Sequence, residues 1–542
     1  MAKMNLEKLR KQSPKEKKTL NGQIGSVSEW LDDRLGLAKG GRVFFNKIFP
    51  DHWSFMLGEI ALYSFVVLLV TGVFLSLYYV PSGALEIYHG TYAPLRGTVV
   101  SAAYSSTVNL SLHVRFGLLV RQMHHWAADI FLGAIAVHMC RIFFTGAFRK
   151  PRELNWIIGV TLLILGIVEG YLGYSLPDDL ISGTGLRLMF SVTESIPIVG
   201  THLAFWIFGG NYPGNGSIIP RMFIAHVLLI PAIITALIVA HLGLLVKQKH
   251  TQFPGPGRTE KNVVGTPMWP GFMFKTQGFM FLVVGVIALL GAFAQINPIW
   301  LYGQYLPYKV SYAVQPDWYM GWLDGALRIM PSWEFQYHSI MIPNQFFPAV
   351  LLPGIVFNIF ILWPFIEAKI TKDKKEHHLL ERPRDNPMRT AIGAGTFTFL
   401  FMLFSASATD VLANYLTISL NIVLWFFRIA TYIIPFIVAA IAYRFCIELQ
   451  RAGDKAGKRK RTNIVWRNEQ GEYYIEKSPA REGDFDVIGE TEEEPIELTP
   501  ELSEELNKKA DLIGVGSSAA TNELAEKFLE SGEDGVKHVS RD

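Results

Sequence analysis

Eight long apolar segments limit what this chain can fold into. Each holds about 20 mostly apolar residues, which is the length a helix needs to cross a bilayer, whereas strands rarely exceed about ten residues. The 542-residue chain is 50% apolar and only 18% charged, below the roughly 25% typical of globular proteins. We therefore expect an all-α membrane protein with eight transmembrane helices. The expected spans are Phe55–Tyr79, Gln122–Phe144, Asn155–Ser175, Arg221–Val246, Lys275–Ile296, Gln345–Glu367, Ala391–Thr409 and Ser419–Phe445.

Basic residues gather after every second span. The segments Arg141–Arg152, Lys247–His250, Lys369–Arg389 and Arg451–Arg461 are rich in Lys and Arg, while the other loops are longer or nearly free of clustered basic residues. Cytoplasmic loops carry this excess of positive charge. The pattern predicts a multi-pass protein of the cell membrane with both termini in the cytoplasm.

The spans divide the chain into four expected parts. Residues 1–50 form a cytoplasmic segment with an amphipathic surface helix, and its basic start is not a cleavable signal. Residues 51–250 form an N-terminal four-helix bundle, and residues 251–447 hold four further helices. Residues 448–542 turn polar, first basic and then acidic, and predict a partly disordered cytoplasmic extension. Two outer segments, about 176–220 and 297–344, are rich in Gly, Pro, Trp and Tyr and are expected to fold over the membrane surface.

Composition excludes several classes of function. The net charge of +3 comes from 50 basic and 47 acidic residues, a balance that does not favour binding of nucleic acid. The two cysteines, Cys140 and Cys446, are far apart. A disulfide scaffold, a zinc finger, a cysteine-ligated iron–sulfur cluster and a covalent C-x-x-C-H haem site are therefore excluded within this chain.

Four histidines inside two spans carry the main chemical signal, since ionisable groups in membrane helices mark function by default. His124 and His138 are 14 residues apart in the second span, so their rings differ by about 40° around the helix and about 21 Å along it. His226 and His241 repeat this in the fourth span, which runs in the same direction. We call His124 and His226 the outer pair, and His138 and His241 the inner pair. Neighbouring His125 points elsewhere.

Two planar cofactors, each clamped by two imidazoles, would fit between these spans. Bis-histidine ligation leaves iron no open site and suits electron transfer. The fourth span has a spacing of 15 rather than 14, which a tilt or a bulge near Pro231 could absorb. The alternative is that each histidine only hydrogen-bonds a neighbouring helix, which is common for one histidine but harder to apply to four at near-equal spacing.

Glycines and arginines support this prediction. Gly58 with Gly72, and Gly159 with Gly173, are also 14 residues apart, and a glycine lets a macrocycle edge approach the backbone; small residues are also generally frequent in membrane helices. Arginines near the span ends could pair with haem propionates, or serve only as interface anchors. These arginines are Arg121, Arg141 and Arg221. His113 and Arg115 are expected to be ordinary loop residues.

A second chemical signal lies in the outer segment 297–344. Gln315-Pro316-Asp317-Trp318-Tyr319 and the later Asp324 place carboxylates and a phenol among aromatic side chains. Such groups could receive protons from a bound quinol, with Asp317, Tyr319 and Asp324 as candidate catalytic residues. The alternative is an interfacial aromatic belt with an Asp that starts a helix.

Together these residues resemble the cytochrome b subunit of respiratory cytochrome bc complexes, in its actinobacterial form. The resemblance covers about 45–445 and includes the histidine and glycine pairs, Arg121-Gln122-Met123-His124, His138-Met139-Cys140-Arg141, Tyr174-Ser175-Leu176-Pro177, Pro316-Asp317-Trp318-Tyr319 and His250–Gly255. It implies two b haems, quinol (menaquinol in this form) oxidised at the outer face, a quinone site at the inner face, and proton translocation. It also implies a Rieske iron–sulfur subunit, a c-type cytochrome subunit, a homodimeric complex and, as an optional partner, a terminal oxidase.

Three departures from the family pattern affect the quinone sites. Asp317 stands where relatives have Glu, and Asp178-Asp179 follows Pro177 in place of Trp-Gly. Lys275-Thr276 replaces a Lys-Asp pair, so Lys275, His250 and Gln252 are the candidates at the inner site. Two other classes stay open: a dihaem anchor of another quinone-linked dehydrogenase, and a transporter whose histidines bind a metal or a proton. Different haem potentials are expected from burial and nearby charge, because the ligands are identical.

Overall fold

The computed structural model describes residues 30, 32–34, 41, 44–214, 216–309, 315–338, 340–459, 461–467 and 473–479. The chain divides into two units, one comprising Met1–Phe253 with Gly257–Lys455 and the other Pro254–Pro256 with Ala456–Asp542. Most of the N-terminal segment 1–50, with its expected surface helix, lies outside the described residues. So does most of the extension 448–542.

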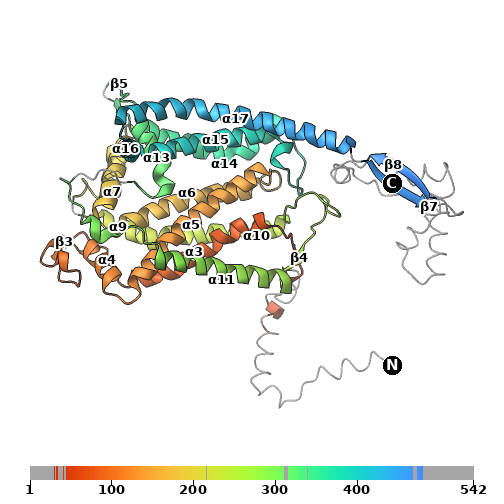
Figure 1. The fold of residues 1–542 in the computed structure, drawn as a ribbon. Coiled ribbons are helices and arrows are strands. Elements are labelled where there is room, and N and C mark those ends of the chain that lie inside the picture. Colours follow the sequence, from red (N-terminus) through yellow and green to blue (C-terminus); the bar gives the residue numbers. More distant parts are fainter. Residues whose placement is uncertain are drawn as a thin grey trace, which may run out of the picture. The chain divides into compact units, whose positions relative to one another are not determined.

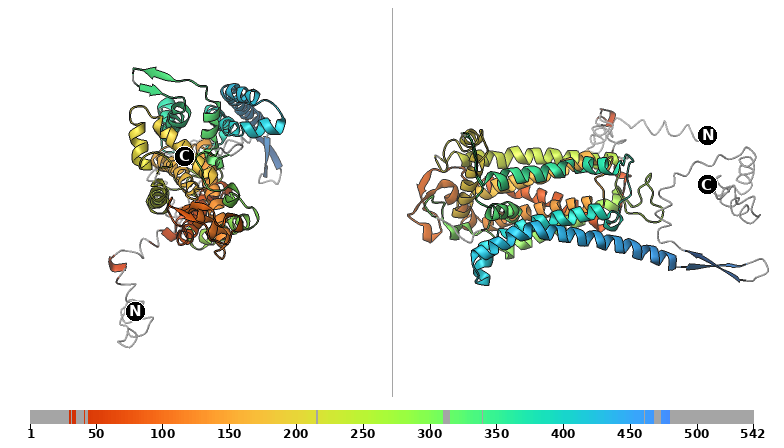
Figure 2. Two further views of the ribbon diagram at one scale, coloured as in Figure 1. Left: turned by 90° about the vertical axis from the view of Figure 1, so that its left-hand side faces the viewer. Right: turned by 90° about the horizontal axis from the view of Figure 1, so that it is seen from above.

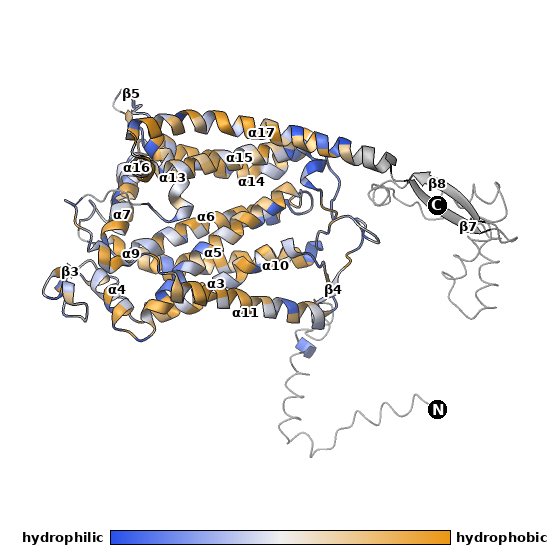
Figure 3. Cartoon of the chain, viewed as in Figure 1, coloured by the Kyte–Doolittle hydropathy of each residue, from blue (hydrophilic) through white to orange (hydrophobic). Residues whose placement is uncertain are grey.

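The eight expected spans are confirmed. They run side by side along one direction (Figures 1 and 2), and hydrophobic residues dominate them along most of their length (Figure 3). The boundaries move by a few residues, and the second, fourth and eighth spans lengthen most. The observed spans are Trp53–Ser76, Gly117–Phe144, Glu153–Ser175, Ile218–Gln248, Met268–Phe293, Phe347–Thr371, Pro387–Ala406 and Leu420–Ala452.

Regular helices make up most of each span, and short 3-10 or π segments begin several of them. The spans are built from η3 (Trp53–Phe55) with α3 (Met56–Ser76), α5 (Gly117–Phe144), α6 (Glu153–Ser175), α9 (Ile218–Ile224) with η5 (Ala225–Leu229) and α10 (Ile230–Gln248), η6 (Met268–Phe272) with α11 (Met273–Phe293), η7 (Phe347–Leu351) with α14 (Leu352–Thr371), α15 (Pro387–Ala406) and α17 (Leu420–Arg459).

The first four spans surround a common apolar core. Phe131, Leu132, Val160 and Ile234 are buried there, one helix against another. Helix α11 packs on α3 and α5, where Ile287 is fully buried, and α14 packs on α6. The bundle of the first four spans is thus closed on two sides by helices from the second half of the chain.

Short elements fold at one end of the spans, at the left in Figure 1. The two segments 176–220 and 297–344 form helices there. The elements of this end are β2 (Leu85–Ile87), η4 (Ala93–Leu95), β3 (Val99–Ser101), α4 (Ala102–Leu112), α7 (Leu180–Glu194), α8 (Gly200–Phe208), α12 (Ile299–Tyr302), α13 (Trp318–Ile329), β5 (Phe335–Tyr337), β6 (Ile340–Ile342) and α16 (Thr409–Leu416). Strands β2 and β3 pair antiparallel, as do β5 and β6.

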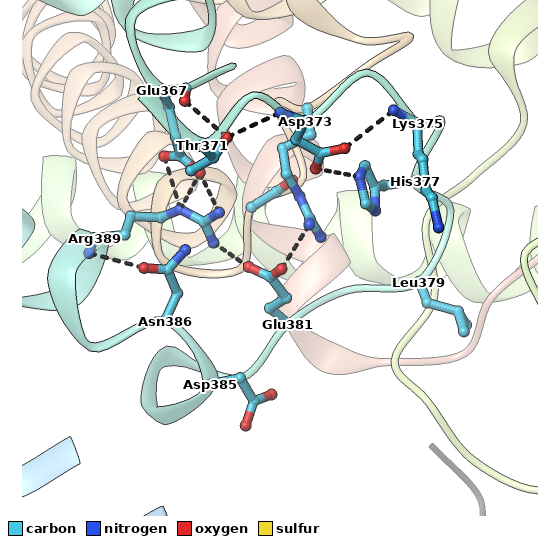
Figure 4. Close-up of polar contacts among 12 residues, drawn as sticks. Glu367, Thr371, Asp373, Lys375, His377, Leu379, Glu381, Asp385, Asn386 and Arg389 are labelled. Carbon is cyan, nitrogen blue, oxygen red and sulfur yellow. Dashed lines mark hydrogen bonds and ion pairs between the residues drawn. The ribbon is translucent and has the colours of Figure 1, made fainter. Parts of the chain in front are cut away.

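The opposite end is closed by a two-stranded ladder and by ion pairs. Strand β1 (Ile48–Phe49) pairs antiparallel with β4 (Thr266–Pro267), and η8 (Pro383–Asp385) precedes α15. Arg389 of α15 donates from Nε to both carboxylate oxygens of Glu367 on α14, at 3.1 and 3.0 Å, and it also pairs with Glu381 (Figure 4). Arg149 reaches Glu381 at 2.5 Å. The network therefore joins α14, α15 and the turn after α5.

We expect Arg389→Ala to destabilise the protein strongly. The Arg389 side chain is 2% exposed and that of Glu367 11% exposed, so removing the cation leaves a buried carboxylate unpaired, at a cost of about 3–5 kcal/mol. Thermal unfolding of the detergent-purified protein measures this. Arg451→Ala is the control, because its ion pair with Glu448 is largely exposed and contributes little. Equal melting temperatures for the two variants would contradict the prediction.

The second unit contributes an antiparallel hairpin of β7 (Arg461–Arg467) and β8 (Tyr473–Pro479), with Val465 opposite Ile475. Both strands have seven residues.

Candidate functional site

The two rings of the outer histidine pair lie close together between two spans, with their planes at 79° to each other. His124 is on α5 and His226 is on η5, and their ring centroids are 6.1 Å apart. A metal ion held between two imidazole nitrogens, at about 2 Å from each, needs ring centroids about 6 Å apart. The spacing of this pair would therefore allow both rings to hold one metal ion.

A π-helical segment explains the unequal spacing of the histidines in the fourth span. Segment η5, residues Ala225–Leu229, contains His226 and ends just before Pro231. A π segment inserts one extra residue into a helix and often marks a functional site. Of the two expected explanations, a tilt or a bulge, the structure shows a bulge, and its extra residue accounts for a spacing of 15 where the second span has 14.

Each of the four paired glycines faces one of the four histidines. A Cβ atom added at these glycines would lie between 2.5 and 3.8 Å from an imidazole Cε1. The facing pairs are Gly72 with His124, Gly173 with His226, Gly58 with His138, and Gly159 with His241. The glycines thus make room for the histidine rings directly, where the sequence had suggested room for a macrocycle edge. The two histidine pairs and the two glycine pairs share the same two levels.

Buried polar atoms at these levels lack partners within the described part of the chain. Nδ1 of His138 and of His241 are among them, as are Nε and Nη2 of Arg141 and Nε of Arg121. Unpaired guanidinium nitrogens suit the carboxylates of haem propionates. Arg221 differs, because it is exposed and donates to the carbonyls of Trp206 and Ile207. The histidines, Arg121 and Arg141 therefore fit haem groups.

A cavity joins the outer histidine pair to the second candidate site. Its lining includes His124, His226, His125, Asp317 and Tyr319. Residues from α5, α6, η5 and the start of α13 therefore face one space.

Asp317 precedes α13 but does not cap it, because its side chain makes no hydrogen bond to that helix's backbone. Instead its Oδ2 lies 3.0 Å from Nε2 of His125 and accepts a hydrogen bond from the Tyr319 hydroxyl at 3.2 Å. Burial raises the pKa of Tyr319 well above its ordinary value, so the phenol stays protonated and can donate. The idea that Asp317 serves only to start a helix does not describe this side chain.

His125 and Asp129 belong to this cluster, although the sequence did not single them out for it. Ligand atoms of His125, Asp129 and Asp317 all lie within 4.8 Å of one another. The rotation that takes His125 away from the line of His124 and His138 turns it towards α13. Asp129 could have been found from sequence, because it is a carboxylate inside an apolar span.

Asp324 is held separately from Asp317. Its Oδ2 accepts from Nε of Arg328 at 2.8 Å, and Arg328 also pairs with Asp410 at 2.9 Å. Burial raises the pKa of Asp324, while Arg328 acts against this shift. Asp324 is thus paired with an arginine, whereas Asp317 has no arginine partner among the described residues and lines the cavity.

Asp178 and Asp179 have structural roles in the loop after α6. Asp179 caps α7 by accepting from the backbone N–H groups of Ile181 and Ser182. Asp178 has a left-handed backbone, with φ of 54°, and its carbonyl accepts from Tyr305 N at 3.0 Å. Burial raises the pKa of the Asp178 carboxyl to about 6. The two residues that replace the family's Trp-Gly therefore stabilise the conformation of this loop.

The three inner-face candidates do not share one set of contacts. Lys275 pairs with Asp51 at 2.9 Å, and both side chains are about half exposed. His250 packs on Phe49, with ring centroids 4.4 Å apart, and burial lowers the pKa of His250 to about 4. The amide of Gln252 is engaged with the loop backbone at Asn262 and Val264.

A carboxylate missed by the sequence reasoning contacts Thr276, the residue after Lys275. Glu59 on α3 accepts a hydrogen bond from Thr276 Oγ1 at 2.7 Å, and the Tyr63 hydroxyl lies 3.4 Å from the same oxygen. Glu59 directly follows Gly58, which faces His138. Thr276 replaces the Asp of the family's Lys-Asp pair, and Glu59 of α3 supplies a carboxylate at this place instead.

Fold and site together define a multi-pass membrane protein with two stacked histidine pairs, which is the arrangement of a b-type cytochrome. The family model "Cytochrome b(N-terminal)/b6/petB" matches residues 129–304. The chain is 46% identical over 481 residues to a cytochrome bc1 complex cytochrome b subunit of Streptomyces coelicolor, covering 88% of each chain. It is 52% identical over 441 residues to the subunit of that name in Mycobacterium leprae, covering 81% of this chain and 80% of the relative.

The chain belongs to the family of cytochrome b subunits of the cytochrome bc1 complex. It is thus a subunit of a quinol–cytochrome c reductase, an electron-transport oxidoreductase of the bacterial plasma membrane. A chain of the solved structure "Hyperthermophilic respiratory Complex III" shares the fold, with a TM-score of 0.56 and 22% identity, covering 77% of this chain and 99% of that chain.

Proposed function

We propose that this subunit oxidises quinol in the cavity beside the outer histidine pair and passes its two electrons along separate routes. One electron goes to a Rieske iron–sulfur partner, and the other crosses to a quinone site near the inner pair, with protons released outside and taken up inside. The observation that carries the proposal is the shared cavity, whose lining holds both His124 and His226 together with Asp317 and Tyr319.

Two b haems, bound by the outer and the inner pair, would supply one-electron chemistry at two depths of the membrane. His124 with His226, and His138 with His241, would hold the irons. Arg121 and Arg141 would pair with propionates, because Nε of Arg121 and both Nε and Nη2 of Arg141 are buried without partners in the described ranges, while Nη2 of Arg121 donates to the carbonyl of Asn297. Arg221, bound to backbone carbonyls, is the weakest of the three arginine candidates.

Asp317 is the proposed proton acceptor at the outer site. Its carboxylate is oriented by the Tyr319 hydroxyl and by Nε2 of His125, and it lines the cavity from the start of α13. General acid–base residues must lie within hydrogen-bond reach of the group they serve. Asp324, paired with Arg328, is the second candidate for this role.

At the inner face we propose a quinone site close to Lys275, His250 and Gln252. Gln252 is committed to loop contacts, so its contribution would be to shape the site. Glu59 extends the proposal, since it places a carboxylate against Thr276, the residue that follows Lys275. Menaquinone is the proposed substrate at both faces. The termini are proposed to be cytoplasmic, in accord with the basic loops.

The proposed assembly contains a Rieske iron–sulfur subunit, a c-type cytochrome subunit and a second copy of this chain. A terminal oxidase is an optional further partner. Each of these partners would bind a chain that is embedded in the lipid membrane by eight spans.

A haem determination on the purified complex tests the proposal. A pyridine haemochrome spectrum should give two b haems for each copy of this chain, and no b-type absorbance would end the haem proposal. Quinol added to the oxidised complex should reduce the iron–sulfur partner and the b haems in equal numbers of electrons. Reduction of the b haems alone would instead identify a haem-bearing anchor without two electron routes.

A further inference from the structure

Glu169 places a carboxylate directly on an outer histidine. It lies within α6, and its Oε1 is 2.8 Å from Nδ1 of His226. The backbone carbonyl of Glu169 lies 3.1 Å from the same nitrogen. Both side chains are mostly buried, with exposures of 17% for Glu169 and 16% for His226. Glu169 thus offers two acceptor oxygens to Nδ1 of His226.

The four candidate ligands differ at their Nδ1 atoms. Nδ1 of His124 lies 2.8 Å from Oγ1 of Thr71, a neutral hydroxyl that itself donates to the carbonyl of Val67. Nδ1 of His138 and of His241 have no side-chain hydrogen-bond partner within the ranges that the structure describes. A carboxylate at Nδ1 therefore distinguishes His226 from the other three, although all four are imidazoles.

An acceptor at Nδ1 alters what the ligand does to iron. When Nε2 binds the metal, Nδ1 carries the proton and donates it to its partner. A carboxylate partner makes the imidazole a more basic ligand, which stabilises the oxidised iron more than the reduced iron. Its negative charge also opposes the arrival of an electron, and the burial of both side chains limits screening of this charge. Both effects lower the reduction potential.

We propose that Glu169 is a positioning residue that holds the outer haem at a lower reduction potential than the inner haem. The inference rests on the proposed function, since it requires a haem at each histidine pair. It explains how identical ligand sets can have different potentials, and it assigns the difference to one contact. Electrons would then move downhill from the outer pair to the inner pair.

The test is a redox titration of the intact complex carrying Glu169→Gln, followed by the optical absorbance of the b haems. Glutamine keeps the length and an acceptor oxygen but removes the charge. We expect both haems to stay bound and the reduction equilibrium of the outer haem to rise at least tenfold, which is 59 mV for a one-electron couple. The inner haem should titrate as in the wild type.

Asp129→Asn is the matched control. It also removes one carboxylate from the bundle near the outer pair, but Asp129 belongs to the cluster with His125 and Asp317 and is not bonded to His226. The inference expects a clearly smaller shift for this variant. An outer haem with unchanged potential in Glu169→Gln, or an equal shift in both variants, would overturn it.

Glu169→Asp keeps the test decisive if Glu169→Gln fails to hold the outer haem. Aspartate retains the charge but is one methylene shorter, so the direct contact with Nδ1 is lost and the potential should rise by part of the full shift. An unchanged potential in this variant would overturn the inference. A wild-type complex without b haems would instead overturn the proposed function.

Discussion

Replacing His138 by leucine is expected to leave one b haem per chain in place of the two that we propose for the wild type. His138 and His241 form the inner pair, and leucine offers no electron pair to iron, so the proposed inner haem would lose one of its two protein ligands. The outer pair is about 21 Å away along α5 and keeps its own facing glycines, Gly72 and Gly173. The outer haem should therefore remain.

The pyridine haemochrome ratio of haem to protein measures this effect, which is a loss of half the haem. His113→Leu is the control, because His113 is an exposed residue that ends α4 and should leave the ratio unchanged. The outer cavity should also stay formed in His138→Leu, since His138 is not part of its lining. A ratio of two in this variant would refute the assignment of the inner ligands.

The sequence predicted the spans and the two histidine levels well, because both follow from local rules. Hydropathy over about 20 residues locates a span, and helical geometry alone aligns His124 with His138. The irregular spacing between His226 and His241 also carried information, since it pointed to the bulge that η5 provides. These features depend on positions close together in the chain.

The contacts that complete the sites could not be predicted in this way. His125 and Asp317 are separated by 192 positions, and Thr276 and Glu59 by 217. Only the packing of α5, α13, α3 and α11 brings such residues together. The same limit applies to Arg221, whose place at a span end suggested a propionate partner, while the fold directs it to backbone carbonyls.

Glu169 and Asp129 were missed for a different reason. Both are carboxylates inside apolar spans, and the rule that led to the four histidines applies equally to them. Their partners, His226 and the cluster around Asp317, are visible only in the fold. A carboxylate within a membrane span therefore indicates a functional site as strongly as a histidine does.

Asp317→Asn is expected to slow quinol oxidation by a factor of about 100 to 10,000, the usual contribution of a positioned acid or base. Asparagine keeps the size of the side chain and an oxygen that can accept from Tyr319, but it cannot take up a proton from quinol. Both haems should stay bound, because Asp317 contacts His125 and Tyr319 and none of the four candidate ligands. The measurements are steady-state quinol–cytochrome c reductase activity and haem content of the same preparation.

Asp324→Asn separates the two candidate carboxylates of α13. Asp324 already shares its charge with Arg328, which is paired in turn with Asp410, and Asp324 is not part of the cavity lining. Its replacement should therefore slow turnover far less than that of Asp317. Wild-type turnover in Asp317→Asn, together with slow turnover in Asp324→Asn, would assign proton acceptance to the acid beside Arg328. The cavity at the outer pair would then bind quinol without taking its proton through Asp317.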